Sequence, residues 1–274
     1  MNLLADLKTL VKLHLSLWCG LAGMAGFITG GGNLLSPEAL LIFSGVFLSS
    51  AGSMSLNQYQ ERNLDALMER TRKRPLPSGR MSPGTALAIG LTLLLCGGVI
   101  LSKFGPVPLF LLTLTVLLYN GLYTPLKRLT FLALIPGIAS GALPSLIGWS
   151  AAGGEMLSRI VPLSLYLVLW QVPHFLVLST RFRKDFSRAR IRTGRVRLPE
   201  GREKTALVLL GVPLILTASA PWLTGYLKNP LSPLIILSGS LLLLLSLALS
   251  NDLRRNFQAL NLHSIFFFVA LFLG

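Results

Sequence analysis

Residues 57–79 read NQYQERNLDALMERTRKRPLPSG, a strongly polar stretch that lies between two apolar segments at about 38–58 and 84–103. The rest of the chain is very different from this stretch. Only 13% of the 274 residues are charged, whereas about a quarter is usual in a soluble domain, and the mean hydropathy is +0.67. The composition predicts an integral membrane protein, in which residues 57–79 form a polar exception that needs an explanation.

Nine apolar segments come close to the roughly 20 residues with which a helix crosses the hydrocarbon core of a bilayer. They lie at about 11–32, 38–58, 84–103, 106–123, 129–150, 160–180, 205–225, 230–250 and 258–274. We therefore expect an all-α, polytopic membrane protein, a bundle of nine transmembrane helices around a central cavity that opens to the cytoplasmic side. We expect a single domain over 1–274, whose cytoplasmic loops at about 59–83 and 181–204 carry the site.

The positive charges follow this topology. The formal net charge is +15, which in a soluble protein would suggest a nucleic-acid partner. If the N-terminus is cytoplasmic, every Lys and Arg except Lys103, Arg159 and Lys228 falls in a cytoplasmic segment, as cytoplasmic loops favour. The sequence therefore predicts an N-terminus inside, a C-terminus outside and no nucleic-acid partner.

Three oxygen-bearing side chains in the polar stretch, Asn57, Glu61 and Asp65, are spaced four residues apart. On a helix this spacing places them on one face, and carboxylates beside a membrane span are usually functional. Two carboxylates and an amide oxygen are hard ligands that suit Mg²⁺, which also binds phosphate oxygens of a substrate. The same spacing also fits a solvated loop in which the acids form salt bridges with neighbouring cations.

A cationic cluster, RTRKR at 70–74, follows directly and is closed by Pro75 and Pro77. Arginine is well shaped for bidentate phosphate contacts, and lysine acts as a point charge. A metal-binding face followed by cations, at the mouth of an apolar cavity, is what a lipid diphosphate requires. These residues favour a site in which the head group binds Mg²⁺ and Arg while the tail lies between helices.

Several motifs in the same order resemble those of the UbiA-type intramembrane prenyltransferases, and most closely those of its haem branch, the protoheme IX farnesyltransferases or haem O synthases. The similar pieces are DALMERTRKRPLPSG (65–79), YTPLKRLT (123–130), GALPSLIGWSAAGG (141–154), WQVPHF (170–175) and RFRKDFSRARI (181–191). The resemblance covers nearly the whole chain. It implies a UbiA-like helical membrane domain in a bacterial-type cytoplasmic membrane, and Mg²⁺-dependent transfer of a farnesyl group from farnesyl diphosphate to a vinyl group of protohaem IX, giving haem O.

The resemblance also implies roles for individual residues. The metal ligands and, with Lys127, the catalytic residues would be Asn57, Glu61, Asp65 and Asp185. The diphosphate would be bound by Arg70, Arg74, Lys127, Arg128 and Lys184, and the haem acceptor by Trp170, Gln171 and His174. Asp185 has a second interpretation as a clamp on the basic loop, and the loop cations, Lys127 and Arg128 among them, also fit simple positive-inside placement. The basic stretch 190–197 is expected to contact anionic membrane lipids.

Some positions depart from the family pattern. Glu61 and Ser145 stand where the family usually has Asp and Pro, and the stretch IRTGRVRLPEG (191–201) is more basic than the family's loop. Three alternatives therefore stay open: a prenyltransferase with a different acceptor, such as a quinone precursor or another lipid, a relative that has lost activity, or a transporter or lipid-binding protein. A transporter would place polar residues deep in its spans, whereas nearly all acids here lie at cytoplasmic ends.

Overall fold

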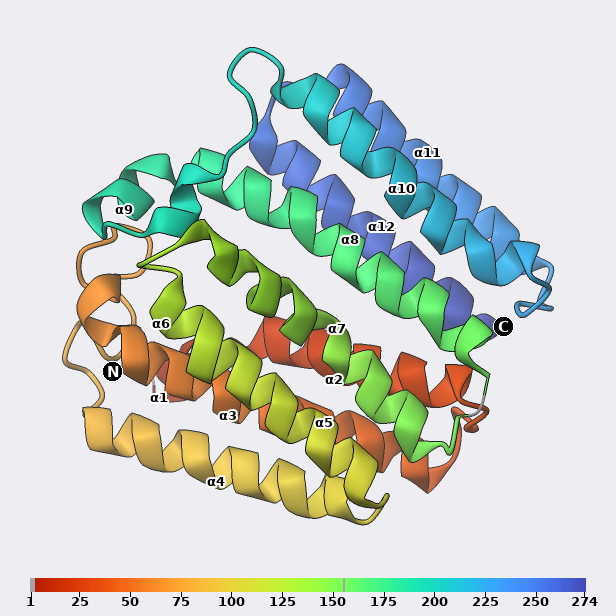
Figure 1. Cartoon of the computed structure of the whole chain (residues 1–274), viewed down its shortest axis with the longest axis horizontal. Helices are drawn as coiled ribbons and strands as arrows, with labels where there is room; N and C mark the ends of the chain where they lie inside the picture. Colours follow the sequence, from red (N-terminus) through yellow and green to blue (C-terminus); the bar gives the residue numbers. More distant parts are fainter. Residues whose placement is uncertain (1–2, 155) are drawn as a thin grey trace. The chain divides into compact units, whose positions relative to one another are not determined.

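The computed structural model describes residues 3–154 and 156–274, and the regular structure in this part of the chain is entirely helical (Figure 1). The elements are α1 (Leu3–Leu10), α2 (Leu13–Thr29), α3 (Pro37–Asp65), α4 (Pro83–Ser102), α5 (Pro106–Val116), the π-helix η1 (Leu117–Tyr123), α6 (Thr124–Leu126), the 3₁₀ helix η2 (Phe131–Ala133), α7 (Leu134–Ala151), α8 (Leu157–Arg181), α9 (Arg183–Arg188), the 3₁₀ helix η3 (Arg192–Arg195), α10 (Glu203–Leu223), α11 (Leu231–Leu249) and α12 (Leu253–Leu273). The predicted all-α class is confirmed.

The helices group into two compact units. In the first unit, α2, α3, α4, α5 and α7 form a closed cycle in which each helix packs against the next and α7 returns to α2. This unit also contains α1, α9 and η3. In the second unit, α8, α10, α11 and α12 form a second closed cycle. The expectation that the whole chain is a single domain stays a prediction.

Eight helices in the described residues are long and apolar enough to cross a membrane, and nine if α1 and α2, which meet at an angle of 50°, count as one broken span. The predicted polytopic architecture is therefore confirmed. The predicted first span, 11–32, begins at a break that the sequence did not reveal, because α1 ends at Leu10, just before it, and α2 begins at Leu13. Many leucines on these helices are exposed, as lipid-facing surfaces require.

Helix α3 includes the first part of the polar stretch, because it continues beyond the apolar segment. It begins after Ser36, whose hydroxyl accepts the backbone N–H of Ala39, with Pro37 in the first turn, where the missing proline N–H is not needed. The predicted apolar segment ends near residue 58, but the helix continues to Asp65. Asn57, Glu61 and Asp65 therefore lie on a regular helix.

Small residues set the contact between α2 and α7. A Cβ added to Gly26 would lie 1.8 Å from the carbonyl oxygen of Ser145, and one added to Gly148 would lie 1.7 Å from that of Gly23. The two backbones are thus in direct contact, which is the usual reason for glycines in membrane helices. This close packing holds the C-terminal half of α2 directly against α7.

Candidate active site

The three oxygen-bearing residues of α3 lie on one buried face, as their spacing predicts. Asn57 is 1% exposed, Glu61 6% and Asp65 1%. Burying two carboxylates is unfavourable unless each is paired. The structure therefore has to supply partners for the two carboxylates, and it does so from two other segments of the chain.

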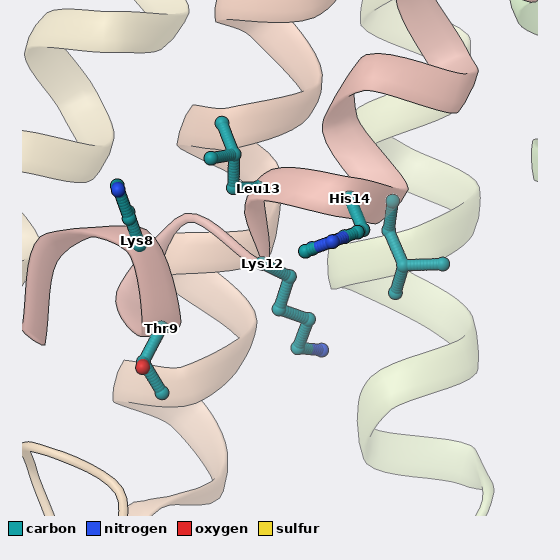
Figure 2. A pocket seen from close by; sticks show the side chains of 6 residues that line it. Lys8, Thr9, Lys12, Leu13 and His14 are labelled. Atoms are coloured by element: carbon teal, nitrogen blue, oxygen red, sulfur yellow. The ribbon is translucent and has the colours of Figure 1, made fainter. Parts of the chain in front are cut away.

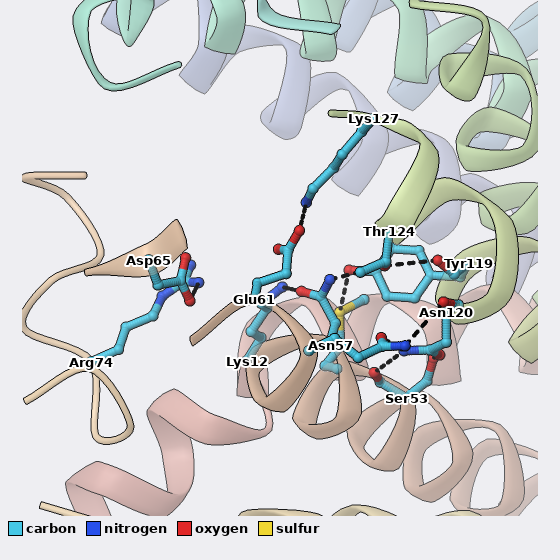
Figure 3. A network of polar contacts seen from close by, with 12 residues as sticks. Lys12, Ser53, Asn57, Glu61, Asp65, Arg74, Tyr119, Asn120, Thr124 and Lys127 are labelled. Carbon is cyan, nitrogen blue, oxygen red and sulfur yellow. Dashed lines mark hydrogen bonds and ion pairs between the residues drawn. The ribbon is translucent and has the colours of Figure 1, made fainter. Parts of the chain in front are cut away.

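Each oxygen-bearing residue on this face meets one cation (Figure 3). Lys12 Nζ donates to Asn57 Oδ1 at 2.8 Å, and Arg74 Nη1 lies 2.7 Å from Asp65 Oδ2. Lys127 Nζ forms an ion pair with Glu61 Oε1. These cations come from the α1–α2 break, the loop after α3 and the end of α6. We call the six residues the polar cluster.

Lys12 is the member of the polar cluster that sequence reasoning missed. It is separated from Asn57 by 45 positions, and in the sequence it looks like a cytoplasmic cation that sets topology. Nothing in the residue type or position of Lys12 distinguishes it from Lys8 as a site residue. Only the break between α1 and α2 brings Lys12 to α3.

Thr124, the first residue of α6, contacts the polar cluster, and the preceding π-helix η1 binds α3 close by. Asn57 Nδ2 donates to Thr124 Oγ1 at 3.1 Å, so both ends of the Asn57 amide are held. Asn120 Nδ2 donates to the Ser53 carbonyl at 3.0 Å and to Gln60 Oε1 at 3.1 Å. A single π turn inside a helix adds a residue and shifts the side chains after it, and such turns often mark functional sites.

Asp185 does not join the α3 face. Its two oxygens accept the backbone N–H groups of Glu69 at 2.9 Å and Arg70 at 3.3 Å. The carboxylate is 5% exposed and connects α9 to the loop at 66–82. This geometry favours the clamp over the second metal site, the two roles that the sequence left open.

The remaining diphosphate candidates lie outside the polar cluster. The guanidinium of Arg70 stacks over the rings of Phe182 and Phe186, with its carbon 5.1 and 5.5 Å from their centroids. Desolvation lowers the pKa of the Arg70 guanidinium from its usual value. Arg128 and Lys184 are exposed. The structure therefore brings Arg74 and Lys127 to the α3 face but not the other three cations.

The acceptor candidates lie on α8 in the second unit. Trp170 Nε1 donates to the Leu260 carbonyl at 3.1 Å. The His174 ring packs between Trp170 and Phe257, with centroids 4.4 and 4.8 Å away. Its Nδ1 atom is buried and has no hydrogen-bond partner, an arrangement that is rare for a buried polar atom. Gln171 is half-buried on the same helix.

A polar network that the sequence did not predict lies nearer the start of α8. Tyr166 Oη is 2.9 Å from His263 Nδ1 and donates to Ser264 Oγ at 3.2 Å. His263 Nε2 is 3.3 Å from Ser240 Oγ. These buried contacts join α8, α11 and α12, and polar side chains of this kind hold membrane helices together.

The α3 face has the chemistry of a hard-metal site. Within residues 3–154 and 156–274 there is no ready-made group of three or more His, Cys, Asp or Glu side chains that could hold a metal. Two carboxylates and an amide oxygen nevertheless fit Mg²⁺, which keeps several waters and binds through one or two carboxylates plus phosphate oxygens. The three paired cations would have to leave those oxygens when the metal binds.

The fold and this cluster together define a polytopic helical membrane protein with a buried, cation-rich carboxylate site. The family model described as "UbiA prenyltransferase family" matches residues 16–272. The chain belongs to the UbiA prenyltransferase family.

Individual relatives agree with this assignment. The protoheme IX farnesyltransferase of Geobacter sulfurreducens is 44% identical over 188 residues, covering 66% of this chain and 67% of that protein. The protoheme IX farnesyltransferase of Bdellovibrio bacteriovorus is 38% identical over 236 residues, covering 81% of this chain and 80% of that protein.

Solved structures show the same fold at low sequence identity. A structure of a digeranylgeranylglyceryl phosphate synthase has a TM-score of 0.70 at 18% identity, covering 100% of this chain and 99% of that one. A UbiA homolog from Archaeoglobus fulgidus, solved with GPP and Mg²⁺, has a TM-score of 0.67 at 16% identity, covering 97% of this chain and 98% of that one.

Proposed function

We propose that this chain transfers a farnesyl group from farnesyl diphosphate to a vinyl group of protohaem IX, in an Mg²⁺-dependent reaction that gives haem O. The observation that carries the donor half is the polar cluster, in which Lys12, Arg74 and Lys127 each lie on one oxygen-bearing residue of α3. The acceptor half rests on the relatives named protoheme IX farnesyltransferase and on the WQVPHF segment.

The donor half of the reaction needs a stabilised leaving group. Asn57, Glu61 and Asp65 would hold the metal, while Arg74 and Lys127 bind the diphosphate oxygens and balance their charge as the allylic C–O bond breaks. Bound Mg²⁺ would supply Lewis-acid stabilisation of the diphosphate. No nucleophile from the protein is needed.

In the acceptor half of the reaction, a new carbon–carbon bond forms at the vinyl group. The allylic carbon bonds to the terminal vinyl carbon, and the positive charge passes to the carbon next to the ring. Water adds there and loses a proton, which gives the hydroxyethylfarnesyl side chain. The unpaired, buried Nδ1 of His174 supports a contact with the acceptor, because histidine is a common haem ligand, and Trp170 and Gln171 would line the same place.

The membrane placement completes the proposal. We infer an N-terminus inside and a C-terminus outside, which puts the polar cluster on the cytoplasmic side where diphosphates are found. The exposed arginines Arg190, Arg192, Arg195 and Arg197 then face anionic lipid head groups, each contributing about 1 kcal/mol to attraction near the surface.

The departures from the family pattern fall mainly on the donor side. The Thr193 backbone N–H, in the altered stretch 191–201, donates to the Lys127 carbonyl at 3.2 Å. Ser145 is fully buried against the α2–α7 contact. The altered stretch thus contacts a residue of the polar cluster, on the donor side of the proposed reaction.

The test is incubation of the purified full chain with Mg²⁺, farnesyl diphosphate and haem, followed by mass spectrometry of the products. We expect haem O, and no product when EDTA removes the metal. Turnover of the diphosphate only with another aromatic acceptor would replace the haem assignment. Failure to bind any diphosphate, with or without Mg²⁺, would favour a transporter or lipid-binding protein.

A further inference from the structure

Lys12 has an unusual backbone conformation at the break between α1 and α2. Its φ and ψ angles are 46° and 57°, in the left-handed region. Among residues 3–154 and 156–274, only Arg190 shares a positive φ without being glycine. A Cβ disfavours this region, and such strained residues persist where the surroundings fix them, often at functional sites.

The surroundings of Lys12 fix this break at several points. Gln58 Nε2 donates to the carbonyls of Thr9 at 2.6 Å and Leu10 at 2.8 Å. Asp6 on α1 accepts three hydrogen bonds from Arg80, at 3.1 and 2.9 Å to Oδ1 and at 3.2 Å to Oδ2. Helix α1 is thus held against α3 and the loop that follows it, so the break has a defined geometry.

The side chain of Lys12 takes a different direction from that of Lys8 (Figure 2). Figure 2 shows the amines of Lys8 and Lys12 pointing in different directions across a pocket lined by both residues. Lys8 is exposed, whereas Lys12 donates to Asn57 Oδ1. The pocket, of about 330 Å³, leaves open space on one side of the Lys12 side chain.

The polar cluster carries more positive than negative charge. Glu61 and Asp65 are the two acids on the α3 face, and three cations rest on that face. Each cation occupies an oxygen that the proposed metal would need. A metal alone must therefore displace cations into an unfavourable environment, whereas a diphosphate offers those cations new partners.

We propose that Lys12 is a third diphosphate-binding cation, which rests on Asn57 when the donor is absent and passes to a phosphate oxygen when the metal takes the Asn57 oxygen. This inference rests on the proposed function. It makes the metal and the diphosphate bind cooperatively, because each removes a contact that opposes the other. It also gives the strained backbone a purpose, since this conformation occurs at the residue whose side chain contacts Asn57 on α3.

The test measures binding without turnover. Lys12→Asn removes the charge and keeps a residue that tolerates the left-handed region, Lys12→Arg keeps the charge, and Lys8→Met is the matched control on the exposed side. Calorimetry follows inorganic pyrophosphate binding in the presence of Mg²⁺. Electron paramagnetic resonance follows binding of Mn²⁺, used in place of Mg²⁺, without pyrophosphate.

We expect Lys12→Asn to weaken pyrophosphate binding by about tenfold or more, the effect of one lost charge-assisted hydrogen bond. Its Mn²⁺ affinity should be equal to that of the wild type or higher, because a competing cation is gone. Lys12→Arg should stay within about threefold of the wild type and Lys8→Met within about twofold, since surface charges contribute little.

Two results would overturn the inference. One is pyrophosphate binding by Lys12→Asn within about twofold of the wild type. The other is a parallel loss of pyrophosphate and Mn²⁺ binding, which a purely structural lysine would cause. If Lys12→Asn does not fold, Lys12→Gly provides the same comparison, because glycine adopts the left-handed region freely. Absence of pyrophosphate binding in the wild type would instead count against the proposed function.

Discussion

The carboxylate of Asp185 accepts the backbone N–H of Glu69 at 2.9 Å, although the two residues are 116 positions apart. The second oxygen accepts the backbone N–H of Arg70 at 3.3 Å. The loop at 66–82, which supplies Arg74 to the polar cluster, is therefore fastened to α9 through its main chain. We therefore expect Asp185 to act on the site by holding this loop in place.

Replacing Asp185 should loosen that loop. Asp185→Ala leaves two N–H groups without their acceptor, and we expect a loss of stability of about 1–3 kcal/mol, with faster trypsin cleavage within residues 70–74. Limited proteolysis and thermal unfolding in detergent measure both effects. Glu69→Gln is the control, because it breaks only the exposed pair with Arg188 and keeps the Glu69 backbone N–H. A cleavage rate in Asp185→Ala equal to that of the control would contradict the clamp.

The metal assignment depends most on Asp65. Asp65→Asn keeps the shape of the side chain but removes a ligand charge and the counter-charge of Arg74, so we expect farnesyl transfer to fall by about 10²-fold or more. Gel filtration and thermal unfolding should show a folded protein. Asp252→Asn, at the exposed N-terminus of α12, is the matched control and should keep full activity. Wild-type activity in Asp65→Asn would remove Asp65 from the metal site.

The ion pair of Glu61 with Lys127 has a structural role and a proposed role in the reaction, and the two can be tested separately. Both side chains are buried, so Glu61→Gln leaves Lys127 without a counter-charge and should destabilise the protein by about 3–5 kcal/mol. The double variant Glu61→Gln/Lys127→Met removes both charges and should recover much of that stability. It should nevertheless stay inactive, because the site has lost a metal ligand and a diphosphate contact. Recovery of transfer activity in the double variant would show that the pair is only structural.

The acceptor assignment predicts a selective defect at His174. His174→Leu removes the unpaired ring nitrogen and keeps an apolar side chain between Trp170 and Phe257. We expect haem binding, followed by the Soret absorption band, to weaken by about tenfold, with pyrophosphate binding unchanged. His263→Leu is the comparison, because that histidine is fully paired with Tyr166 and Ser240 and should affect stability instead. Equal haem binding in His174→Leu and the wild type would exclude a haem contact at this residue.

The sequence predicted those features that depend on local patterns of residues. Apolar runs located the spans to within several residues, and the four-residue spacing of Asn57, Glu61 and Asp65 predicted their common face correctly. The sequence did not predict that Lys12 contacts Asn57 or that Asn120 supports α3, because both contacts depend on departures from a regular helix. A left-handed residue at position 12 and a π turn at 117–123 change which side chains meet α3, and neither has a clear signal in residue type or spacing.

The backbone contact between α2 and α7 gives a prediction about stability alone. Gly26→Ala and Gly148→Ala would place a Cβ 1.8 and 1.7 Å from carbonyl oxygens of the facing helix, so the helices must separate, and we expect a loss of about 1–3 kcal/mol or more. Gly98→Ala on α4 is the matched control, because its Cβ would find its nearest neighbour at an ordinary 3.8 Å. That variant should be neutral or up to about 1 kcal/mol more stable, since alanine favours the helix over glycine. Thermal unfolding in detergent separates the two outcomes, and equal effects of the three substitutions would mean that α2 and α7 do not pack this closely.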